Sequence, residues 1–255
     1  MLKSGRIRKV PVIVAGAFAL VFAVPDVAFA APPPALPANA DALDRAFQPG
    51  YDYDSDGCYA VPAMGPDGSI NGGLKTTGSL SGSCRDASDL LNTNGYSRSK
   101  CNNGWCAIMY ASYFEKDQAI PGWDPFGHRH DWEHVVVWVQ DNEAKYVATS
   151  AHGDFDIYPR DTIRWDGTHP KVVYHKDGVS THCFRPANSQ DEPPENHQQA
   201  WQYPALIGWN GYPAGLRDKL AAANFGSAHF GLKDGSFESN IAEAKPSGIP
   251  FDPYA

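Results

Sequence analysis

The sequence lacks the short motifs by which several enzyme classes are recognised. It has no G-x-S-x-G nucleophile elbow, no glycine-rich phosphate loop and no H-E-x-x-H zinc helix. It also has no N-x-S/T glycosylation sequon and no internal repeat. Beyond residue 30, no apolar run is long enough to cross a bilayer as a helix. With the standard signatures missing, the acidic and histidine-rich segments become the informative ones.

Positive charge is also scarce. The chain has 21 lysine and arginine residues against 29 aspartate and glutamate residues, which gives a net charge of −8 at pH 7. Nucleic-acid binding is not expected, because the phosphate backbone favours lysine and arginine. The same acidic balance repels anionic membranes. Contact with an anionic lipid headgroup would therefore need a bound cation or a specific pocket.

The first thirty residues have the pattern of a secretory signal. Four basic residues precede an apolar stretch at 10–24, and A-F-A at 28–30 suits a signal-peptide cleavage site. The alternative is a buried N-terminal helix. Removal of residues 1–30 would change the net charge to about −11, and we expect a secreted, extracellular protein that is a monomer in solution. Residues 31–50 are typical of a proline-rich tail and lead-in, and 51–255 suit a single domain.

Cysteine is sparse but sufficient for cross-links. There are five cysteines, and export makes disulfides plausible. Five cysteines allow fifteen ways to form two bridges, so the pairing is open. Closeness in the sequence favours Cys58–Cys84 and Cys101–Cys106. Cys183 would then be the odd thiol, which we expect to be buried and inert.

Short apolar runs, separated by turn residues, dominate the chain and indicate β-strands. They lie at 106–114, 134–139, 145–151, 161–165 and 171–175. Two segments have helical patterns, 40–47 and 213–226, the second with Pro213 in its first turn and Gly226 at a C-terminal cap. We therefore predict a mainly β fold, a sandwich or barrel, with few helices.

The densest group of ionisable residues is G-H-R-H-D-W-E at 127–133, directly before the apolar run. Strand alternation places Asp131 and Glu133 on one face, about 7 Å apart at the backbone. Two neighbouring carboxylates at the edge of a core repel each other unless a positive charge lies between them. A divalent cation is the simplest such charge, and His128 could add a third ligand. This ligand set favours a hard ion such as Mg²⁺, Ca²⁺ or Mn²⁺.

Two other interpretations of this segment stay open. Arg129 and the histidines could pair with the acids in a surface ion network. The order H-x-H-D also resembles binuclear metallohydrolases, although Asp131 follows His130 directly and so faces the opposite way. A Ser-His-Asp triad at 150–156 is disfavoured, since residues two apart on a strand lie beyond hydrogen-bond reach. These residues fit better as lining for the same polar end of the domain.

A second acidic segment precedes Cys58. D-x-D-x-D-G, formed by Asp52, Asp54 and Asp56 with the following glycine, matches the first half of an EF-hand-type calcium loop. The twelfth position is Ala63, so the bidentate glutamate of such a loop is missing. The segment predicts either a second, structural calcium ion or an acidic, solvated turn.

Together these segments resemble one family, the necrosis- and ethylene-inducing peptide-like proteins (NPP1-like cytolysins) of plant-associated microbes. The family heptapeptide G-H-R-H-D-W-E is intact at 127–133, and M-Y-A-S-Y-F-E-K-D at 109–117 is similar to a second hallmark. Residues 57–75 and 223–228 also look like family blocks. The D-x-D-x-D-G-C start and the additional cysteine pair resemble the family's second class, which has a calcium motif and a second disulfide.

The resemblance implies a central β-sandwich flanked by helices, similar to actinoporins, and no enzymatic activity. A divalent cation, Mg²⁺ or Ca²⁺, would bind at the bottom of a cleft. Its ligands would be Asp117, His128, Asp131 and Glu133. The target would be the sugar headgroup of plant glycosylinositol phosphoryl ceramides, and binding would damage the plasma membrane and cause necrosis.

Several assignments are left open by the resemblance. Asp124 lies nearer to the heptapeptide than Asp117, so either aspartate could complete the metal site. Candidate headgroup contacts are His130, Asp124, Asn196 and His197. Pro193 stands where the family has an aromatic residue in the membrane-facing loop. A secreted metal-dependent hydrolase and a non-toxic secreted elicitor of plant immunity are the alternative functions.

Overall fold

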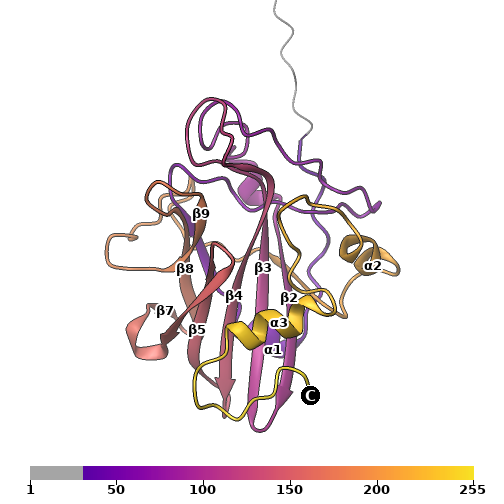
Figure 1. Cartoon of the computed structure of the whole chain (residues 1–255), viewed down its shortest axis with the longest axis vertical. Helices are drawn as coiled ribbons and strands as arrows, with labels where there is room; N and C mark the ends of the chain where they lie inside the picture. The colour runs from indigo at the N-terminus through magenta and orange to yellow at the C-terminus, as the bar shows by residue number, and fades with distance from the viewer. Residues whose placement is uncertain (1–30) are drawn as a thin grey trace, which may run out of the picture.

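Ten strands and three short helices make up the fold in the computed structural model, which describes residues 31–255 (Figure 1). The expected signal peptide, 1–30, lies outside the described residues. The strands are β1 (Gly50–Tyr53), β2 (Asn94–Asn102), β3 (Trp105–Asp117), β4 (His128–Gln140), β5 (Glu143–Ala151), β6 (Asp154–Pro159), β7 (Trp165–Asp166), β8 (His169–Lys176), β9 (His182–Pro186) and β10 (Ala205–Gly208). The helices are α1 (Ala42–Ala46), α2 (Leu216–Ala221) and α3 (Ser236–Glu243), with 3₁₀ turns at Asp89–Leu91 and Arg160–Thr162. None of the helices in the described part of the chain is long and apolar enough to cross a membrane.

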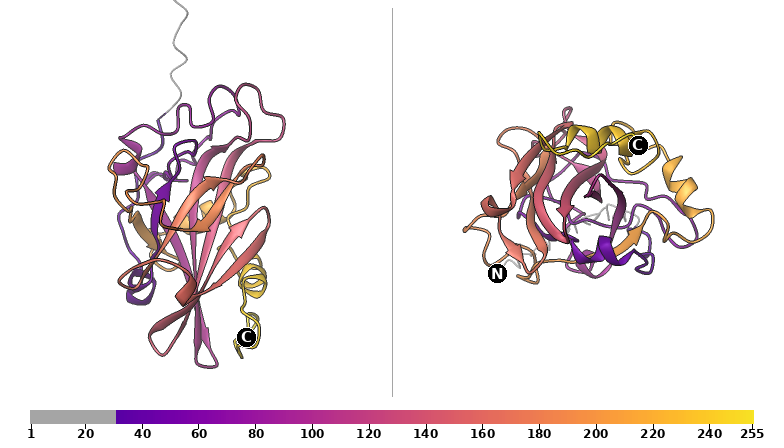
Figure 2. Two further views of the ribbon diagram at one scale, coloured as in Figure 1. Left: turned by 90° about the vertical axis from the view of Figure 1, so that its left-hand side faces the viewer. Right: turned by 90° about the horizontal axis from the view of Figure 1, so that it is seen from below.

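Two β-sheets form the framework. The larger has six strands in the order β10-β2-β3-β4-β5-β6, antiparallel except for the parallel pair β10 and β2. The smaller contains β1, β8, β7 and β9, with β1 parallel to β8. The long strands β3 and β4 run through the middle of the molecule, and α3 lies across one face of the large sheet (Figures 1 and 2). The predicted mainly β sandwich with few flanking helices is confirmed.

Strand β4 shows why the sequence folds in this way. Val135, Val137 and Val139 pack into a core shared with the small sheet, in which Tyr174 and Phe184 lie. Alternate residues of the same strand, including Trp132, Val136 and Trp138, pack into a second core that contains Phe237 and Ile241 of α3. Because both faces of the central sheet are covered, the strand is apolar on both sides and its sequence is a nearly continuous hydrophobic run.

Some sequence predictions were wrong in detail. In the run 161–165, the first two residues end a 3₁₀ turn, the next two are irregular, and only Trp165 belongs to a strand. The helix predicted over 213–226 covers only Leu216–Ala221. It cannot begin at Pro213, because Gly215 has a left-handed φ of 77° directly before the first helical residue.

Residues 31–50 are not a free tail. Leu36 is only 1% exposed and belongs to the core beneath α2 and α3. The Asn94 side chain accepts a hydrogen bond from the Leu36 amide at 2.8 Å and donates one to the Leu36 carbonyl at 2.9 Å. Asn39 then forms a parallel bridge to Ile207 of β10. Composition suggested a loose segment, whereas the hydrogen bonds of this backbone fix it to the sheet edge.

Both expected disulfides are present, Cys58–Cys84 and Cys101–Cys106, and Cys183 is a buried free thiol. The first bridge joins positions 26 residues apart, whereas the second closes the β2–β3 hairpin across five. Chain-entropy arguments assign a larger stabilisation to the longer loop.

Removing the Cys58–Cys84 bridge should therefore destabilise the protein more than removing the Cys101–Cys106 bridge. Replacing both Cys58 and Cys84 by serine is expected to lower the free energy of unfolding by about 3.5 kcal/mol, and the same change at Cys101 and Cys106 by about 2 kcal/mol. Urea unfolding of the two double variants measures the difference. Equal losses, or a larger loss for the hairpin bridge, would contradict the loop-entropy explanation.

Candidate functional site

A cleft of about 470 Å³ opens where the two sheets and α3 meet. Its walls carry the four predicted metal ligands, Asp117, His128, Asp131 and Glu133, together with Ser150 and His182. They come from β3, β4, β5 and β9. The expectation that Ser150 and His152 line the same polar end as the heptapeptide agrees with this placement.

The heptapeptide forms the first half of β4. His128 pairs with Asp117 of β3, and Asp131 pairs with Phe114. Asp131 and Glu133 line the cleft, whereas Trp132, which also borders it, packs its ring on Phe225 and Phe230 in the core beneath α3. Strand alternation therefore predicted correctly which residues share a face.

Three of the predicted metal ligands converge. Asp117, His128 and Asp131 each offer one ligand atom, and these atoms lie within 4.8 Å of one another. His128 Nε2 is 3.8 Å from Asp117 Oδ2, and Tyr174 donates a hydrogen bond of 2.9 Å to Asp131 Oδ2. The aspartates are almost completely buried, and His128 is partly exposed. Pairs of carboxylate oxygens with an imidazole nitrogen form a donor set that suits a hard divalent cation.

Burial and the negative charge of a neighbouring carboxylate make Asp131 and Glu133 poor anions. Burial and the charge of Asp117 raise the pKa of the Asp131 carboxyl to about 7. Burial and the charge of Asp131 raise the pKa of Glu133 well above its ordinary value. The described part of the chain places no lysine or arginine ion pair on either group. A bound cation would supply the missing positive charge, so the residues fit such an ion.

Glu133 occupies a different position from the other three predicted ligands. Its carboxylate accepts a hydrogen bond from the Ser150 hydroxyl, which also accepts one from the His134 amide at 2.7 Å. Glu133 is therefore held at the wall of the cleft by β5, outside the group that converges within 4.8 Å. Glu133 could still contact an ion held by the aspartates through a bridging water molecule.

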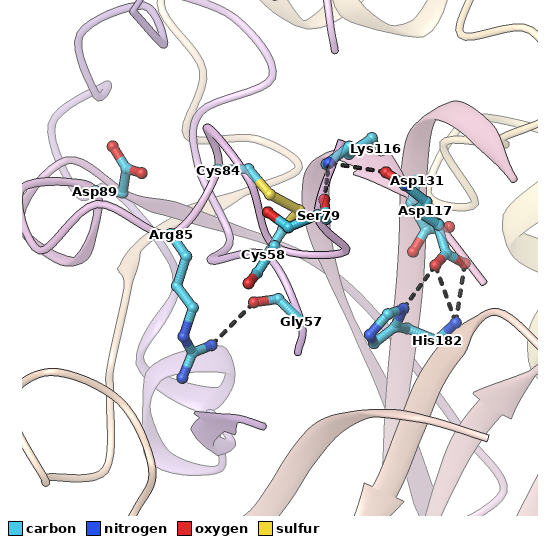
Figure 3. Close-up of a disulfide and its surroundings, with 12 residues drawn as sticks. Gly57, Cys58, Ser79, Cys84, Arg85, Asp89, Lys116, Asp117, Asp131 and His182 are labelled. Carbon is cyan, nitrogen blue, oxygen red and sulfur yellow. Dashed lines mark hydrogen bonds and ion pairs between the residues drawn. A yellow bond between two sulfur atoms is a disulfide. The ribbon is translucent and has the colours of Figure 1, made fainter. Parts of the chain in front are cut away.

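His182 of β9 is a member of the site that the sequence did not reveal. Its amide donates to both carboxylate oxygens of Asp117 at 3.0 Å, and its Nδ1 lies 2.7 Å from Asp117 Oδ1 (Figure 3). Burial lowers the pKa of the ring, but the hydrogen bond to Asp117 and the negative charge of Asp56, 3.6 Å from Nε2, outweigh it and raise the pKa to about 9. His182 thus orients the Asp117 carboxylate from the small sheet. Its only sequence signal was a position next to the odd cysteine.

The choice between Asp117 and Asp124 follows from the β3–β4 loop. Asp124 accepts hydrogen bonds from the amides of Ala119, Ile120 and Phe126 at 2.5, 3.1 and 2.9 Å. Its carboxylate therefore organises its own loop and does not line the cleft. Asp117, although farther from the heptapeptide in sequence, is the aspartate that lies beside His128.

The other candidate headgroup contacts do not gather in the cleft. His130 has a left-handed φ of 64°, and its ring turns to Tyr113, whose hydroxyl lies 2.6 Å from Nδ1. Asn196 is buried and uses its side chain to hold Asp52 and the Ala200 carbonyl. His197 is exposed and contacts the Tyr59 hydroxyl at 2.7 Å. None of the three lines the cleft.

The carboxylates of the predicted calcium motif do not converge either. Asp52 is buried in β1 and accepts hydrogen bonds from the backbone of the loop after β9. Asp54 lies 3.6 Å from Arg185, and Asp56 lies 3.6 Å from His182 Nε2. Of the described residues, the groups that could hold a metal do not include any of these three. The three aspartates of the D-x-D-x-D pattern therefore contact three different groups. The first of them, Asp52, lies within strand β1 and not in a loop.

Comparison with known proteins finds a matching family model, similar sequences and similar solved structures. Residues 41–244 match the family model described as "Necrosis inducing protein (NPP1)". NLP effector protein 10 of Phytophthora capsici is 36% identical over 225 residues, which cover 86% of this chain and 88% of that protein. Among solved structures, NLPPya in complex with mannosamine has a TM-score of 0.71 and 32% identity, covering 84% of this chain and 96% of that one. The non-toxic HaNLP3 protein has a TM-score of 0.70 and 29% identity, covering 84% and 97%.

The family match spans the cleft, the heptapeptide and both disulfides, and the structural neighbours share the β-sandwich with its two sheets. The resemblance therefore extends over most of the described domain and is not restricted to one motif. On these grounds the chain belongs to the necrosis-inducing protein (NPP1) family.

Proposed function

We propose that this protein is a secreted, non-enzymatic cytolysin that binds the sugar headgroup of a plant sphingolipid, a glycosylinositol phosphoryl ceramide. The observation that carries the proposal is the convergence of Asp117, His128 and Asp131 at one side of an open polar cleft. Two disulfides agree with export to an oxidising environment. The homologues are named as effector proteins and not as enzymes.

A divalent cation would be held by Asp117, His128 and Asp131, with Glu133 at the wall and His182 orienting Asp117. When bound, the ion would offer a positive coordination point for hydroxyl or phosphate oxygens of a headgroup. The chain itself is acidic, so this local positive charge would allow an anionic lipid headgroup to approach. Complexes of a related protein with amino sugars support a sugar as the group that enters the cleft.

The β3–β4 loop suits contact with a lipid surface. It begins after Asp117 and ends before His128, and at its tip Trp123 and Phe126 are 74% and 76% exposed. Exposed aromatic side chains are favourable at the boundary between headgroups and acyl chains. We propose that this loop provides the aromatic contact with the membrane. The loop after β9 does not provide it, because Pro193 stands there where the family has an aromatic residue.

Changing Trp123 and Phe126 to alanine is expected to reduce vesicle leakage about tenfold or more, since each side chain loses apolar contact with the bilayer. Cation binding should be unchanged, because neither residue contacts the cluster. Leu91→Ala is the matched control, since Leu91 is 81% exposed on a different segment. The aromatic contact would be disproved by a double variant as lytic as the wild type.

Dye leakage from vesicles with and without the plant sphingolipid tests the function itself. The proposal predicts rapid leakage only when the sphingolipid and a divalent cation are both present, with no release of phosphate, sugar or fatty acid. Release of any of these products would favour the hydrolase instead. Binding of the headgroup without leakage would reject the cytolysin and favour the elicitor.

The non-toxic elicitor is the second candidate, because the fold is equally similar to that of HaNLP3, a protein described as non-toxic. Infiltration into leaves separates the two functions. The cytolysin predicts tissue necrosis that a cation-site variant fails to cause. Defence responses of equal strength from both proteins, without necrosis, would identify the elicitor.

A further inference from the structure

A second group of metal-ligating side chains lies at the rim of the cleft. Cys183 of β9, His152 of the β5–β6 turn and Asp177 of the β8–β9 turn each offer one ligand atom, and these atoms lie within 4.8 Å of one another. His152 Nε2 is 3.1 Å from Asp177 Oδ2. His175 Nε2 lies 3.5 Å from the Cys183 sulfur, so a second imidazole is next to the thiol.

Two tight turns hold these side chains in place. His152 and Gly153 have φ values of 54° and 91° and join the paired residues Ala151 and Asp154, which is the geometry of a two-residue hairpin. In the other turn, the Asp177 amide donates to the Thr181 carbonyl at 3.1 Å and the Asp177 carbonyl accepts from Ser180 at 2.9 Å. The turns belong to different sheets, so the cluster bridges the sandwich.

The thiol is the group that distinguishes this cluster from the one in the cleft. The other four cysteines form disulfides, and Cys183 is 3% exposed. It faces the partly exposed pair of His152 and Asp177, which connects a buried sulfur to solvent. Thiolate and imidazole ligands select zinc over magnesium or calcium, which prefer oxygen.

We propose that Cys183, His152 and Asp177 bind a zinc ion, with His175 or a water molecule as the fourth ligand. Ligand atoms around one tetrahedral zinc lie roughly 3–4 Å apart, so small side-chain rotations close the observed cluster onto an ion. The bound metal removes the thiol proton and balances the charges of the thiolate and the Asp177 carboxylate. Because His152 also lines the cleft, the zinc ion would fix one rim of the headgroup site and join the two sheets.

The site is tested by titrating the metal-free protein with zinc chloride and, in a second titration, with cobalt chloride as a spectroscopic substitute for zinc. We expect a sulfur-to-cobalt charge-transfer band in the wild type and in Asp131→Asn, which removes a ligand of the cleft cluster only. Cys183→Ser should lose the band. His152→Ala, a change at an exposed turn, should bind zinc at this site about 10–100-fold more weakly, whereas His169→Ala, at the opposite end of β8, should not.

Zinc should also raise the unfolding temperature of the wild type and not that of His152→Ala. A wild type without the charge-transfer band would overturn the proposal, and so would equal zinc affinities in the wild type and His152→Ala. Zinc binding that Asp131→Asn abolishes and Cys183→Ser leaves intact would assign the bound metal to the cleft cluster instead. Failure of vesicle leakage has no bearing on these outcomes, since they report metal binding alone.

Discussion

Asp131→Asn is expected to weaken magnesium binding more than about 100-fold and to abolish leakage of vesicles that contain the plant sphingolipid. Asparagine has the same shape and can still accept the hydrogen bond from Tyr174, so the strand should keep its geometry. It lacks the charge that attracts the cation, and it removes one of two buried acids that repel each other. The metal-free variant should therefore be at least as stable as the metal-free wild type.

Two measurements separate these effects. Calorimetric titration with magnesium chloride reports the binding site, and urea unfolding in chelator reports the fold. Asp156→Asn is the control, because it removes one negative charge from exposed strand β6 of the same sheet. Normal leakage by Asp131→Asn would show that the cluster has no part in the activity. A large loss of stability in chelator would instead make Asp131 a structural residue.

Asp52→Ala is expected to lower the free energy of unfolding by about 3–5 kcal/mol, with or without calcium. The Asp52 carboxylate accepts hydrogen bonds from the amides of Glu195 and Asn196 at 3.0 and 3.3 Å and from Asn196 Nδ2 at 2.8 Å. The variant would leave these buried donors without an acceptor and release the loop after β9 from β1. The acidic motif is therefore expected to stabilise a loop through its first member.

Matched variants at Asp54 and Asp56 complete this test. Both side chains are partly exposed and each has one partner at 3.6 Å, so alanine there should change stability by about 1 kcal/mol or less. Urea unfolding of the three variants in calcium and in chelator provides the comparison. If all three lost the same calcium-dependent stability, the second calcium site would be real and the structural explanation of Asp52 would be wrong.

The parts of the site that sequence predicted correctly depend on local periodicity. Asp131 and Glu133 share a face because they are two residues apart in a strand, and the apolar run that follows fixes that strand in the core. The disulfide pairs were also local, since each joins two cysteines that follow one another in the order of cysteines along the chain. Proximity along the chain was a sufficient guide for these features.

The features that the sequence could not supply depend on contacts between distant segments. His182 lies 65 residues from Asp117, and only the packing of β9 against β4 and β5 brings its ring to that carboxylate. Asp124 was a reasonable ligand by distance along the chain, yet its own loop amides hold its carboxylate. The short helix α3 escaped detection because eight residues bury only Phe237 and Ile241.

The carboxylates of the second acidic motif do not converge for a related reason. A calcium loop needs consecutive residues to curl around an ion, and the sequence spacing alone agrees with that geometry. Asp52 instead belongs to strand β1, paired in parallel with β8, and its carboxylate is held by the loop after β9, whereas Asp56 lies beside His182. Pairing with β8, whose paired residues lie 121 positions later in the chain, fixes the extended conformation of Asp52.

Diffraction from a crystal soaked in manganese chloride, with data collected for anomalous scattering, tests the central claim most directly. The account predicts a peak at about 2–2.5 Å from a carboxylate oxygen of Asp117, from one of Asp131 and from a ring nitrogen of His128, and no such peak in Asp131→Asn. A cleft without a peak, or an equally strong peak in the variant, would contradict it.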